Sequence, residues 1–261
     1  MSEQSDALVP LSVLVPVKNE AANVRDCLAS VSFAQEIVVV DSGSTDGTQA
    51  VAEAAGARIV QFVWSGKFPR KKNWALQNVR WQHEWVLILD ADERITPALE
   101  REITQAIRRT DVDGFYLNRR FWFLGGWIKH CGYFPSWNLR LFRHGLGRYE
   151  QIEIDDHIAT GDNEVHEHIL LNGRAEYLLA PMEHYAFPDI ATFIEKHNHY
   201  STCEAAACVK LHERAVGTTL RATPFGTAVE RKRWLKGLAM GGSVPPELAI
   251  LLPLPLEARF L

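Results

Sequence analysis

The chain has 261 residues, of which 47% are hydrophobic and 23% charged, and its formal net charge at pH 7 is −4. That length and apolar content suffice for one large domain or two small ones with a substantial core. The mild negative charge gives no reason to expect nucleic-acid binding. No apolar run approaches the roughly 20 residues of a membrane-spanning helix, so we expect a soluble protein or one that only touches a membrane surface.

The two features that report on compartment both predict the cytoplasm. The first ten residues, MSEQSDALVP, are polar and acidic, unlike a signal peptide. The cysteines are scattered without a CxxC pair, which is typical of reduced thiols used as small buried side chains. They are Cys27, Cys131, Cys203 and Cys208.

Strand and helix patterns alternate through the first 90 residues. Apolar or β-branched runs predict strands over 11–17, 36–41, 58–63 and 85–90. Helical spacing between them predicts helices over 20–31, over the segment ending near Gly56, and over 70–81. Ser44 or Thr45 is expected to cap the second helix and Gly56 to end it. This alternation predicts an α/β fold whose mostly parallel, Rossmann-like sheet carries helices on both faces.

Three polar clusters follow predicted strands. They read PVKNE at 16–20, DSGSTDGT at 41–48 and DADE at 90–93. A single Asp at a strand end is commonly a turn or cap residue. Three such clusters on the edge where parallel strands end favour a binding site there.

The composition of these clusters indicates how phosphates would be bound. No GxGxxG and no P-loop follows the first strand, so a bare backbone cradle is not expected. Asp90, Asp92 and Glu93 repel one another, and the stretch VLILDADE at 86–93 contains no basic residue before Arg94. We therefore expect a cation to gather these acids. Mg²⁺ or Mn²⁺, which favour carboxylates and bridge diphosphate oxygens, suit the pattern.

Four segments carry a family resemblance in a set order: LSVLVPVKNEAANVRDCLASV, EIVVVDSGSTDGT, KKNWAL and WVLILDADER. They resemble successive motifs of the family 2 glycosyltransferases, which have a GT-A fold. Later segments resemble the branch of lipopolysaccharide-core β-glucosyltransferases and exopolysaccharide enzymes: YFPSWNLRLFRHG, EVHEHILLNG and KHNHYST. The resemblance runs from about Leu11 to Thr202.

The resemblance implies inverting transfer of a sugar, most readily from a UDP-hexose, to a saccharide or lipid-linked acceptor in lipopolysaccharide or exopolysaccharide synthesis. Pro16 and Glu20 would then line the nucleoside pocket, and Asp41 would hydrogen-bond the base. Asp90 would lie near the ribose and metal. Asp92 would ligate the divalent cation.

The leaving nucleoside diphosphate gains negative charge during transfer, which a fixed cation and a nearby lysine can stabilise. Lys71 or Lys72 suits that task. An exposed basic helix face is the alternative explanation for both lysines.

Inverting transfer also needs a general base that takes the acceptor proton. In this branch the position is a carboxylate downstream of DADE, which makes Glu167 the candidate, with His166 as its neighbour. Asp155 and Asp156 are rival acids. Glu167 on a solvated strand edge is the structural alternative.

Two further clusters allow more than one interpretation. A zinc site is an alternative use of the clustered histidines, although no HExxH occurs and the family block usually has Arg at the position of His199. These histidines are His166, His168, His184, His197 and His199. Aromatic residues between 115 and 137 suit either sugar stacking or packing on the sheet. They are Trp122, Trp127, Tyr133 and Trp137.

Two other functions are compatible with parts of the sequence. LILDADERIT resembles the first motif of haloacid-dehalogenase-like phosphotransfer enzymes, which would make Asp90 a nucleophile, but such motifs usually open a domain. A non-catalytic nucleotide-sugar-binding protein is the second alternative. Release of UDP or of phosphate would distinguish them.

The resemblance divides the chain into a nucleotide-sugar-binding half (8–125), an acceptor-binding and catalytic half (126–200) and a helical extension (201–261). Within the extension, ERKRWLKGLAM at 230–240 has cations flanking Trp234 and Leu235, as in a helix lying on an anionic membrane. This favours a cytoplasmic protein with peripheral contact at the inner membrane. An ordinary packed amphipathic helix is the alternative.

Overall fold

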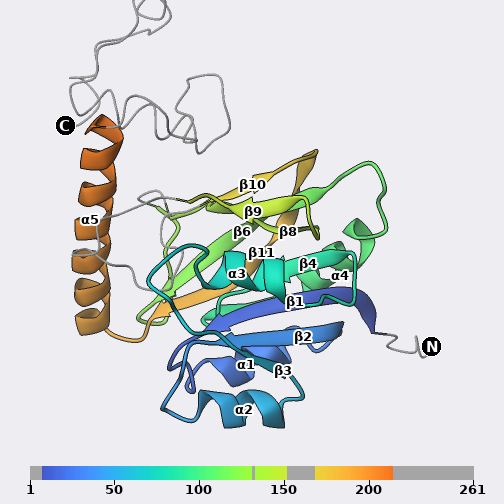
Figure 1. The fold of residues 1–261 in the computed structure, drawn as a ribbon, viewed down its shortest axis with the longest axis horizontal. Coiled ribbons are helices and arrows are strands. Elements are labelled where there is room, and N and C mark those ends of the chain that lie inside the picture. Colours follow the sequence, from blue (N-terminus) through green and yellow to red (C-terminus); the bar gives the residue numbers. More distant parts are fainter. Residues whose placement is uncertain (1–7, 131–132, 152–167, 214–261) are drawn as a thin grey trace, which may run out of the picture. The chain divides into compact units, whose positions relative to one another are not determined.

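A computed structural model of the chain describes residues 8–130, 133–151 and 168–213 (Figure 1). The chain divides into two compact units, Met1–Lys210 and Leu211–Leu261. Within the described ranges, no helix has the length and apolar character needed to cross a bilayer. Several predicted features lie outside these ranges, namely Glu167, His166, Asp155, Asp156 and the segment 230–240.

A nine-stranded sheet organises the first unit, in the order β3-β2-β1-β4-β8-β6-β11-β5, with β7 paired to β6. The strands are β1 Val9–Val17, β2 Ala34–Asp41, β3 Arg58–Gln61, β4 Trp85–Ile88, β5 Glu93–Arg94, β6 Gly114–Phe123, β7 Gly126–Trp127, β8 Trp137–Arg143 and β11 Ala175–Phe187. A separate two-stranded sheet pairs β9 (Gly147–Tyr149) with β10 (Ile169–Leu171). The ends of the four predicted strands lie within two residues of those observed.

The sheet changes character at β4. The first four strands are mutually parallel, as the alternation predicted. Strand β8 then runs antiparallel to both β4 and β6, and β11 runs parallel to β6. Strands β1, β2, β4, β6 and β11 consequently all end at the same edge of the sheet. Polar side chains that follow these strands can therefore meet there.

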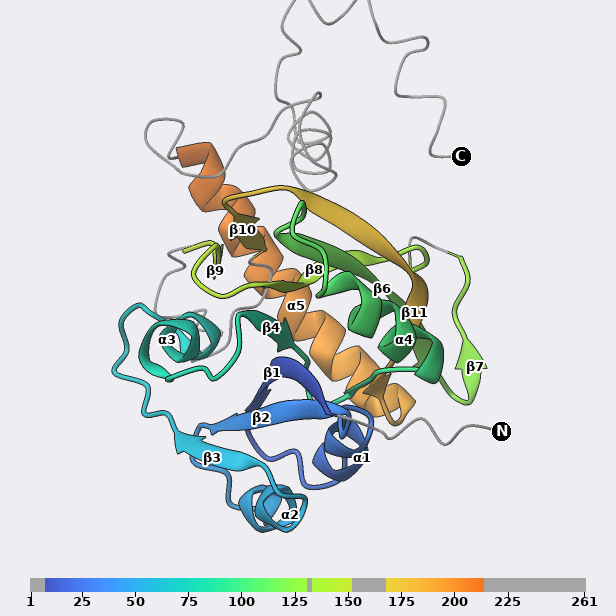
Figure 2. The ribbon, with the colours of Figure 1, turned by 90° about the vertical axis from the view of Figure 1, so that its right-hand side faces the viewer.

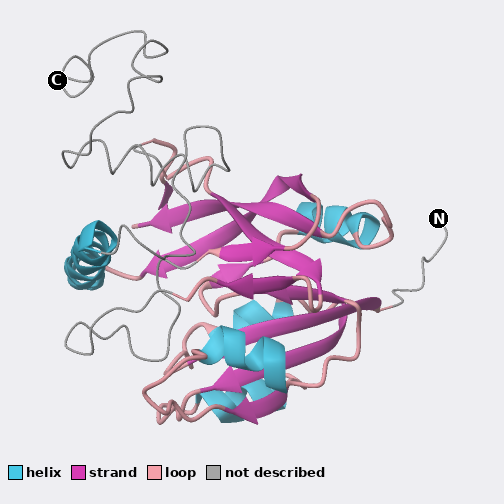
Figure 3. Cartoon of the chain, turned by 45° about the horizontal axis from the view of Figure 1, so that its top comes forward, coloured by secondary structure: helices cyan, strands magenta, loops and turns pink. Residues whose placement is uncertain are grey.

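Helices cover both faces of the sheet, as predicted (Figures 2 and 3). The helices are α1 Val24–Ala29, α2 Thr48–Ala54, α3 Lys71–Asn78, α4 Pro97–Ala106 and α5 Ile190–Glu213. Side chains of α1, α2 and α4 pack into one apolar cluster with β1 and β4. Helix α3 belongs to a second cluster on the other face, with Leu14 and Ile88. The α/β class is confirmed.

The predicted cap of the second helix is wrong. Helix α2 follows Gly47, whose φ of 90° is left-handed and which has no side chain to cap it, while Asp46 Oδ1 accepts from the backbone N–H of Thr48 at 3.0 Å. Ser44 and Thr45 are engaged elsewhere, because both bond to Asn19 in the loop after β1. Gly56 follows the helix with a φ of 82°, a conformation that glycine adopts without steric cost, so the predicted end is confirmed.

The packing of β9 against β8 provides a stability test. A Cβ added at Gly147 would lie 2.5 Å from Cδ2 of the fully buried Phe142 ring. Gly147→Ala should therefore lower the free energy of unfolding by about 1–3 kcal/mol, the usual cost of overpacking. At Gly126 the nearest atom would be 3.6 Å away, so Gly126→Ala should change little. Equal melting temperatures for the two variants would contradict this packing.

Candidate active site

The acids that follow β4 lie among basic side chains of the protein itself. Lys72 Nζ lies 2.9 Å from Asp90 Oδ1, and Arg140 Nη2 lies 2.7 Å from Asp90 Oδ2. The same Arg140 nitrogen is 3.0 Å from Glu93 Oε1. The expectation that a divalent cation must gather all three acids is therefore corrected, because Arg140 and Lys72 already neutralise Asp90 and Glu93.

Arg140 reaches these acids from an irregular point in the sheet. Opposite β6, Phe115 faces Leu141 and Tyr116 faces Leu139, so Arg140 has no residue across from it in this pairing. Such a bulge changes the direction of a side chain relative to a regular strand. Arg140 is buried, and its two carboxylate partners compensate for the burial of its charge. Arg140 was not predicted as a site residue, although a cation in the apolar strand LRLF was a usable signal.

Glu93 and Asp92 connect this cluster to β11. Glu93 is fully buried, and its Oε2 accepts a hydrogen bond of 2.9 Å from the backbone N–H of Asp90. In the β5–β11 pairing Glu93 lies opposite His184, whose Nε2 is 3.3 Å from Asp92 Oδ2. Arg119 adds a more distant cation, 3.8 Å from Glu93. Both halves of the sheet therefore contribute to one charged cluster.

The electrostatics keep the two aspartates ionised. Burial alone would raise the pKa of Asp90, but the charges of Arg140 and Lys72 outweigh it and hold that pKa well below the ordinary value. At Asp92 burial alone would also raise the pKa, but the charge of His184 and its hydrogen bond to the carboxylate outweigh burial. The pKa of Asp92 is therefore lowered as well. Both are therefore carboxylates at neutral pH.

Glu20, at the end of the first polar cluster, lies in the same electrostatic field. Burial raises its pKa, and the negative charges of Asp92 and Asp90 raise it further, while a hydrogen bond from Asn23 lowers it. The loop after β1 and the loop after β4 are therefore close enough to interact. This brings together two of the three predicted clusters.

The third cluster is joined to the first by hydrogen bonds. The backbone N–H of Asn19 donates to Ser44 Oγ at 2.8 Å, and Asn19 Oδ1 accepts from the backbone N–H of Thr45 at 2.9 Å. Asn19 has a left-handed φ of 57°, which Asn tolerates better than most residues. The loops after β1 and β2 are therefore fixed to each other without a ligand.

Asp41 organises the loop in which it lies. Its buried carboxylate accepts from the backbone N–H groups of Gly43 and Ser44, each at 3.0 Å, and from Gln49 Nε2 at 2.7 Å. Burial alone would raise the pKa of Asp41, but these hydrogen bonds outweigh it and hold the pKa below the ordinary value. Pro16, the other predicted nucleoside-pocket residue, lies half-buried in β1 opposite Val40.

The exposed-helix explanation for Lys71 and Lys72 is wrong. Their side chains belong to residues that are only 1% and 9% exposed. Lys71 Nζ donates to the carbonyl of Val17 at 3.0 Å, at the end of β1, and Lys72 contacts Asp90. Helix α3 therefore brings two buried cations to the edge that carries the acids.

The described residues contain no group of three or more His, Cys, Asp and Glu side chains arranged to hold a metal ion. The zinc alternative therefore has no support within that part of the chain. A catalytic divalent cation needs less, because one or two carboxylates plus substrate phosphates and waters complete its shell. Asp92 fits that role: it is ionised, and its side chain is 19% exposed.

The predicted aromatic residues pack against other rings. Trp122 stacks on Tyr185 with ring centroids 6.2 Å apart, and Trp137 meets Tyr177 edge-on at 4.9 Å. Tyr133 donates or accepts a hydrogen bond at His197 Nε2, 3.1 Å away. The packing explanation holds for these contacts, and sugar stacking stays a prediction.

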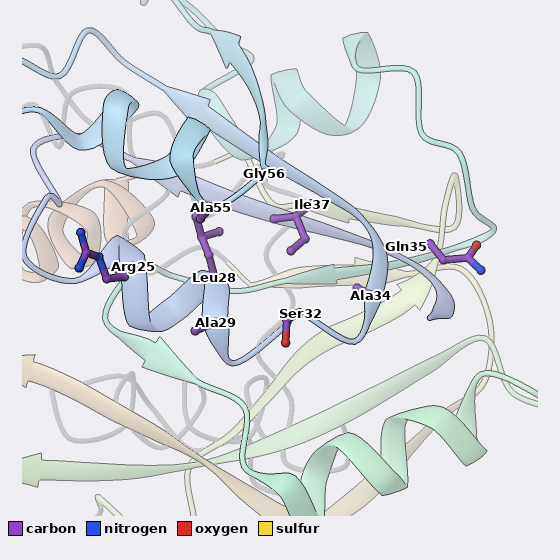
Figure 4. Close-up of a pocket in the computed structure, with 9 residues that line it drawn as sticks. All are labelled: Arg25, Leu28, Ala29, Ser32, Ala34, Gln35, Ile37, Ala55 and Gly56. Atoms are coloured by element: carbon purple, nitrogen blue, oxygen red, sulfur yellow. The ribbon is translucent and has the colours of Figure 1, made fainter. Parts of the chain in front are cut away.

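A hollow of about 340 Å³ lies elsewhere, between α1, α2 and the start of β2 (Figure 4). Leu28, Ala34 and Ala55 are among its lining residues. Ala34 begins β2, whereas the charged cluster lies beyond the strand ends. We therefore assign the site by its chemistry at the carboxyl edge and not by this hollow.

The chain is similar to known glycosyltransferases in sequence and in fold. The family model described as Glycosyl transferase family 2 matches residues 12–162. The lipopolysaccharide core biosynthesis glycosyltransferase LpsC of Rhizobium meliloti (strain 1021) is 32% identical over 218 residues, covering 79% of this chain and 74% of LpsC. An uncharacterized glycosyltransferase of Rickettsia felis is 28% identical, covering 77% and 70%. The S. aureus TarS 1–349 structure in complex with UDP-GlcNAc superposes with a TM-score of 0.53 at 16% identity, covering 92% and 78%.

The role of Arg140 can be tested through stability. Arg140→Ala leaves the fully buried Glu93 and the partly exposed Asp90 without their main cation, so it should cost about 3–5 kcal/mol in urea unfolding at pH 7. Because the folded-state pKa of Asp90 is lowered, its contribution is present above the ordinary pKa of about 4 and lost as pH falls below it. The difference from wild type should therefore shrink in acid.

Arg109→Ala is the matched control, since Arg109 pairs with Asp111 and Glu176 at the surface. Its removal should change stability only slightly. A loss at Arg140 no larger than that at Arg109 would show that the buried cluster does not depend on the guanidinium.

Proposed function

The chain belongs to glycosyl transferase family 2 and has the GT-A fold, and we propose that it transfers a hexose from a UDP-sugar, with inversion, to a hydroxyl of a saccharide or lipid-linked acceptor. The observation that carries this proposal is the ionised, partly accessible Asp92 at the edge where the parallel strands end. It lies beside Asp90, whose negative charge is compensated by Lys72 and Arg140. The similarity to LpsC supports lipopolysaccharide synthesis as the setting, with exopolysaccharide as the related alternative.

The donor would bind across the loops after β1 and β2. Pro16 and Glu20 would line the nucleoside pocket, and Asp41 would accept a hydrogen bond from the base. Gln49 now donates to Asp41 from helix α2, so a base N–H could replace that amide without leaving the carboxylate unpaired. The UDP-GlcNAc complex of TarS, a protein of the same fold, supports a nucleotide-sugar donor.

A divalent cation, Mg²⁺ or Mn²⁺, would be held by Asp92, with Asp90 close by. Such an ion, when bound, neutralises diphosphate charge. Lys71 and Lys72 lie buried at the same edge and would stabilise the charge of the leaving diphosphate. Their burial supports this role, because a charge in a water-poor site acts more strongly than one in solvent.

Glu167 would remove the proton from the acceptor hydroxyl, with His166 as a neighbour that orients it or meets the acceptor. Asp155 and Asp156 are the rival bases. All four residues lie outside the described part of the chain, so the assignment rests on the family resemblance of EVHEHILLNG.

The two alternatives have less support. A haloacid-dehalogenase-like enzyme would need Asp90 as a free nucleophile, but Lys72 and Arg140 occupy both of its oxygens. A non-catalytic sugar-nucleotide-binding protein would not release UDP.

We place the enzyme in the cytoplasm, with residues 230–240 contacting the anionic inner membrane.

Asp92→Asn should reduce Mn²⁺-dependent release of UDP from UDP-hexose at least about a hundredfold, because a neutral amide is a much poorer ligand for a hard cation. The melting temperature should fall only slightly, since the amide oxygen can still accept a hydrogen bond from His184 and only the charge of Asp92 is lost. Asp26→Asn alters an exposed acid and serves as the control. Full activity of Asp92→Asn across a Mn²⁺ titration would refute the metal assignment.

Glu167→Gln should transfer sugar about a hundredfold more slowly, the usual contribution of a positioned base, while its affinity for the UDP-sugar stays the same. Transfer rates and donor affinities should be measured in parallel for Asp155→Asn and Asp156→Asn. If one of these loses transfer and Glu167→Gln does not, the base is the rival acid.

A further inference from the structure

The hairpin between β6 and β7 breaks a local rule of turn chemistry. Phe123 pairs with Gly126, so the turn consists of Leu124 and Gly125 alone. Both have positive φ, 49° and 76°. Two-residue turns of this kind favour Asn-Gly, because Asn tolerates the left-handed conformation that strains a leucine. A strained residue in an exposed turn suggests that its side chain serves a function.

The strained side chain is also apolar and exposed. Leu124 is 62% exposed at the tip of a hairpin, where neither folding nor solubility favours a leucine. Behind it, the Trp127 ring lies between two cations: Arg120 Cζ is 4.7 Å and Lys129 Nζ 4.9 Å from the ring centroid. Lys129 is itself exposed. An apolar tip backed by tryptophan and lysine is the arrangement of groups that lie at a membrane interface.

The first turns of α5 pack on the base of the hairpin and carry further exposed apolar side chains. The Phe123 ring stacks on Phe193 of α5 with centroids 4.9 Å apart, so the base of the hairpin packs on the helix (Figure 2). Ile190 and Ile194, four residues apart and hence on one helical face, are 55% and 60% exposed. We call Leu124, Ile190 and Ile194 the apolar tip.

We propose that the apolar tip inserts into the headgroup region of a lipid bilayer. A protruding tip with tryptophan and lysine behind it suits a fluid surface, whereas a protein partner would need a matching groove. The charge is mixed, since Asp189 and Glu195 are exposed near the isoleucines and Glu183 pairs with Arg120. Insertion of apolar side chains, more than attraction to anionic lipid, should therefore provide the affinity.

The apolar tip follows the same edge of the sheet that carries the candidate active site. Strands β6 and β11 end at the edge that carries Asp90 and Asp92, and the tip follows those two strands. A protein seated on a bilayer through the tip would hold this edge close to lipid-anchored molecules. The inference goes beyond the proposed function and does not rest on it, because lipid binding needs no sugar donor.

The test is flotation of the full chain with phosphatidylcholine vesicles, with and without about 30% phosphatidylglycerol to supply an anionic surface. No nucleotide sugar is added. Leu124→Asn should weaken vesicle partitioning about tenfold, since burial of a leucine side chain is worth at least that factor. Its melting temperature should not fall, because Asn-Gly relieves the turn. Adding Ile190→Asn and Ile194→Asn should reduce binding to the uncharged phosphatidylcholine vesicles to background, whereas the contact proposed for residues 230–240 depends on anionic lipid and should persist on vesicles with phosphatidylglycerol.

Val63→Asn is the matched control, because Val63 is 86% exposed in the loop after β3, outside the tip. Its vesicle binding should equal that of wild type. Three results would overturn the proposal: no binding by wild type, equal binding by Leu124→Asn and wild type, or an equal loss for Val63→Asn. Loss of self-association in Leu124→Asn, measured by light scattering, without loss of vesicle binding would identify the tip as a protein contact instead.

Discussion

The ion pair of one arginine with two acids, the buried Glu93 and the partly exposed Asp90, determines the arrangement of the candidate site. Arg140 comes from β8, Asp90 follows β4, and Glu93 lies in β5, so a single guanidinium joins three segments. In the ladder between β5 and β11, Glu93 lies opposite His184, and the His184 side chain contacts Asp92. Without this cation, β4 would end in mutually repelling charges inside a poorly solvated region. The guanidinium suits the task, since its fork of donors can serve two carboxylates where an ammonium would act as a point charge.

This arrangement separates the roles of the two aspartates. Lys72 and Arg140 compensate the charge of Asp90, whereas Asp92 is paired with His184. Both side chains keep partial exposure, 30% for Asp90 and 19% for Asp92, so the two acids differ in their cationic partners and not in their access to solvent. The buried positive charges also lie where the diphosphate of a sugar donor would be expected, next to the ends of β1 and β4.

Local patterns in the sequence predicted what depends on local chemistry. The four parallel strands, their helices on both faces and the convergence of three polar clusters were foreseen, because apolar runs and strand ends are visible along the chain. The bulge at Arg140 was not, since it depends on how β6 and β8 are paired over more than twenty residues. The cap at Ser44 failed for a similar reason, because a distant residue, Asn19, takes that hydroxyl. Burial of Lys71 also needed the assembled sheet.

The sharing of one carboxylate by two cations constrains how this protein can change in evolution. Loss of Asp90 alone would leave the charges of Lys72 and Arg140 close together without their shared carboxylate. Loss of either cation alone would leave the charge of Asp90 only partly compensated. The effects of such substitutions are therefore non-additive, as expected for residues in one charged network. A different set of charges at Lys72, Asp90 and Arg140 can therefore evolve mainly through paired replacements. We expect these three positions either to change together or to stay the same, whereas the exposed ion pairs of the same fold can change one residue at a time.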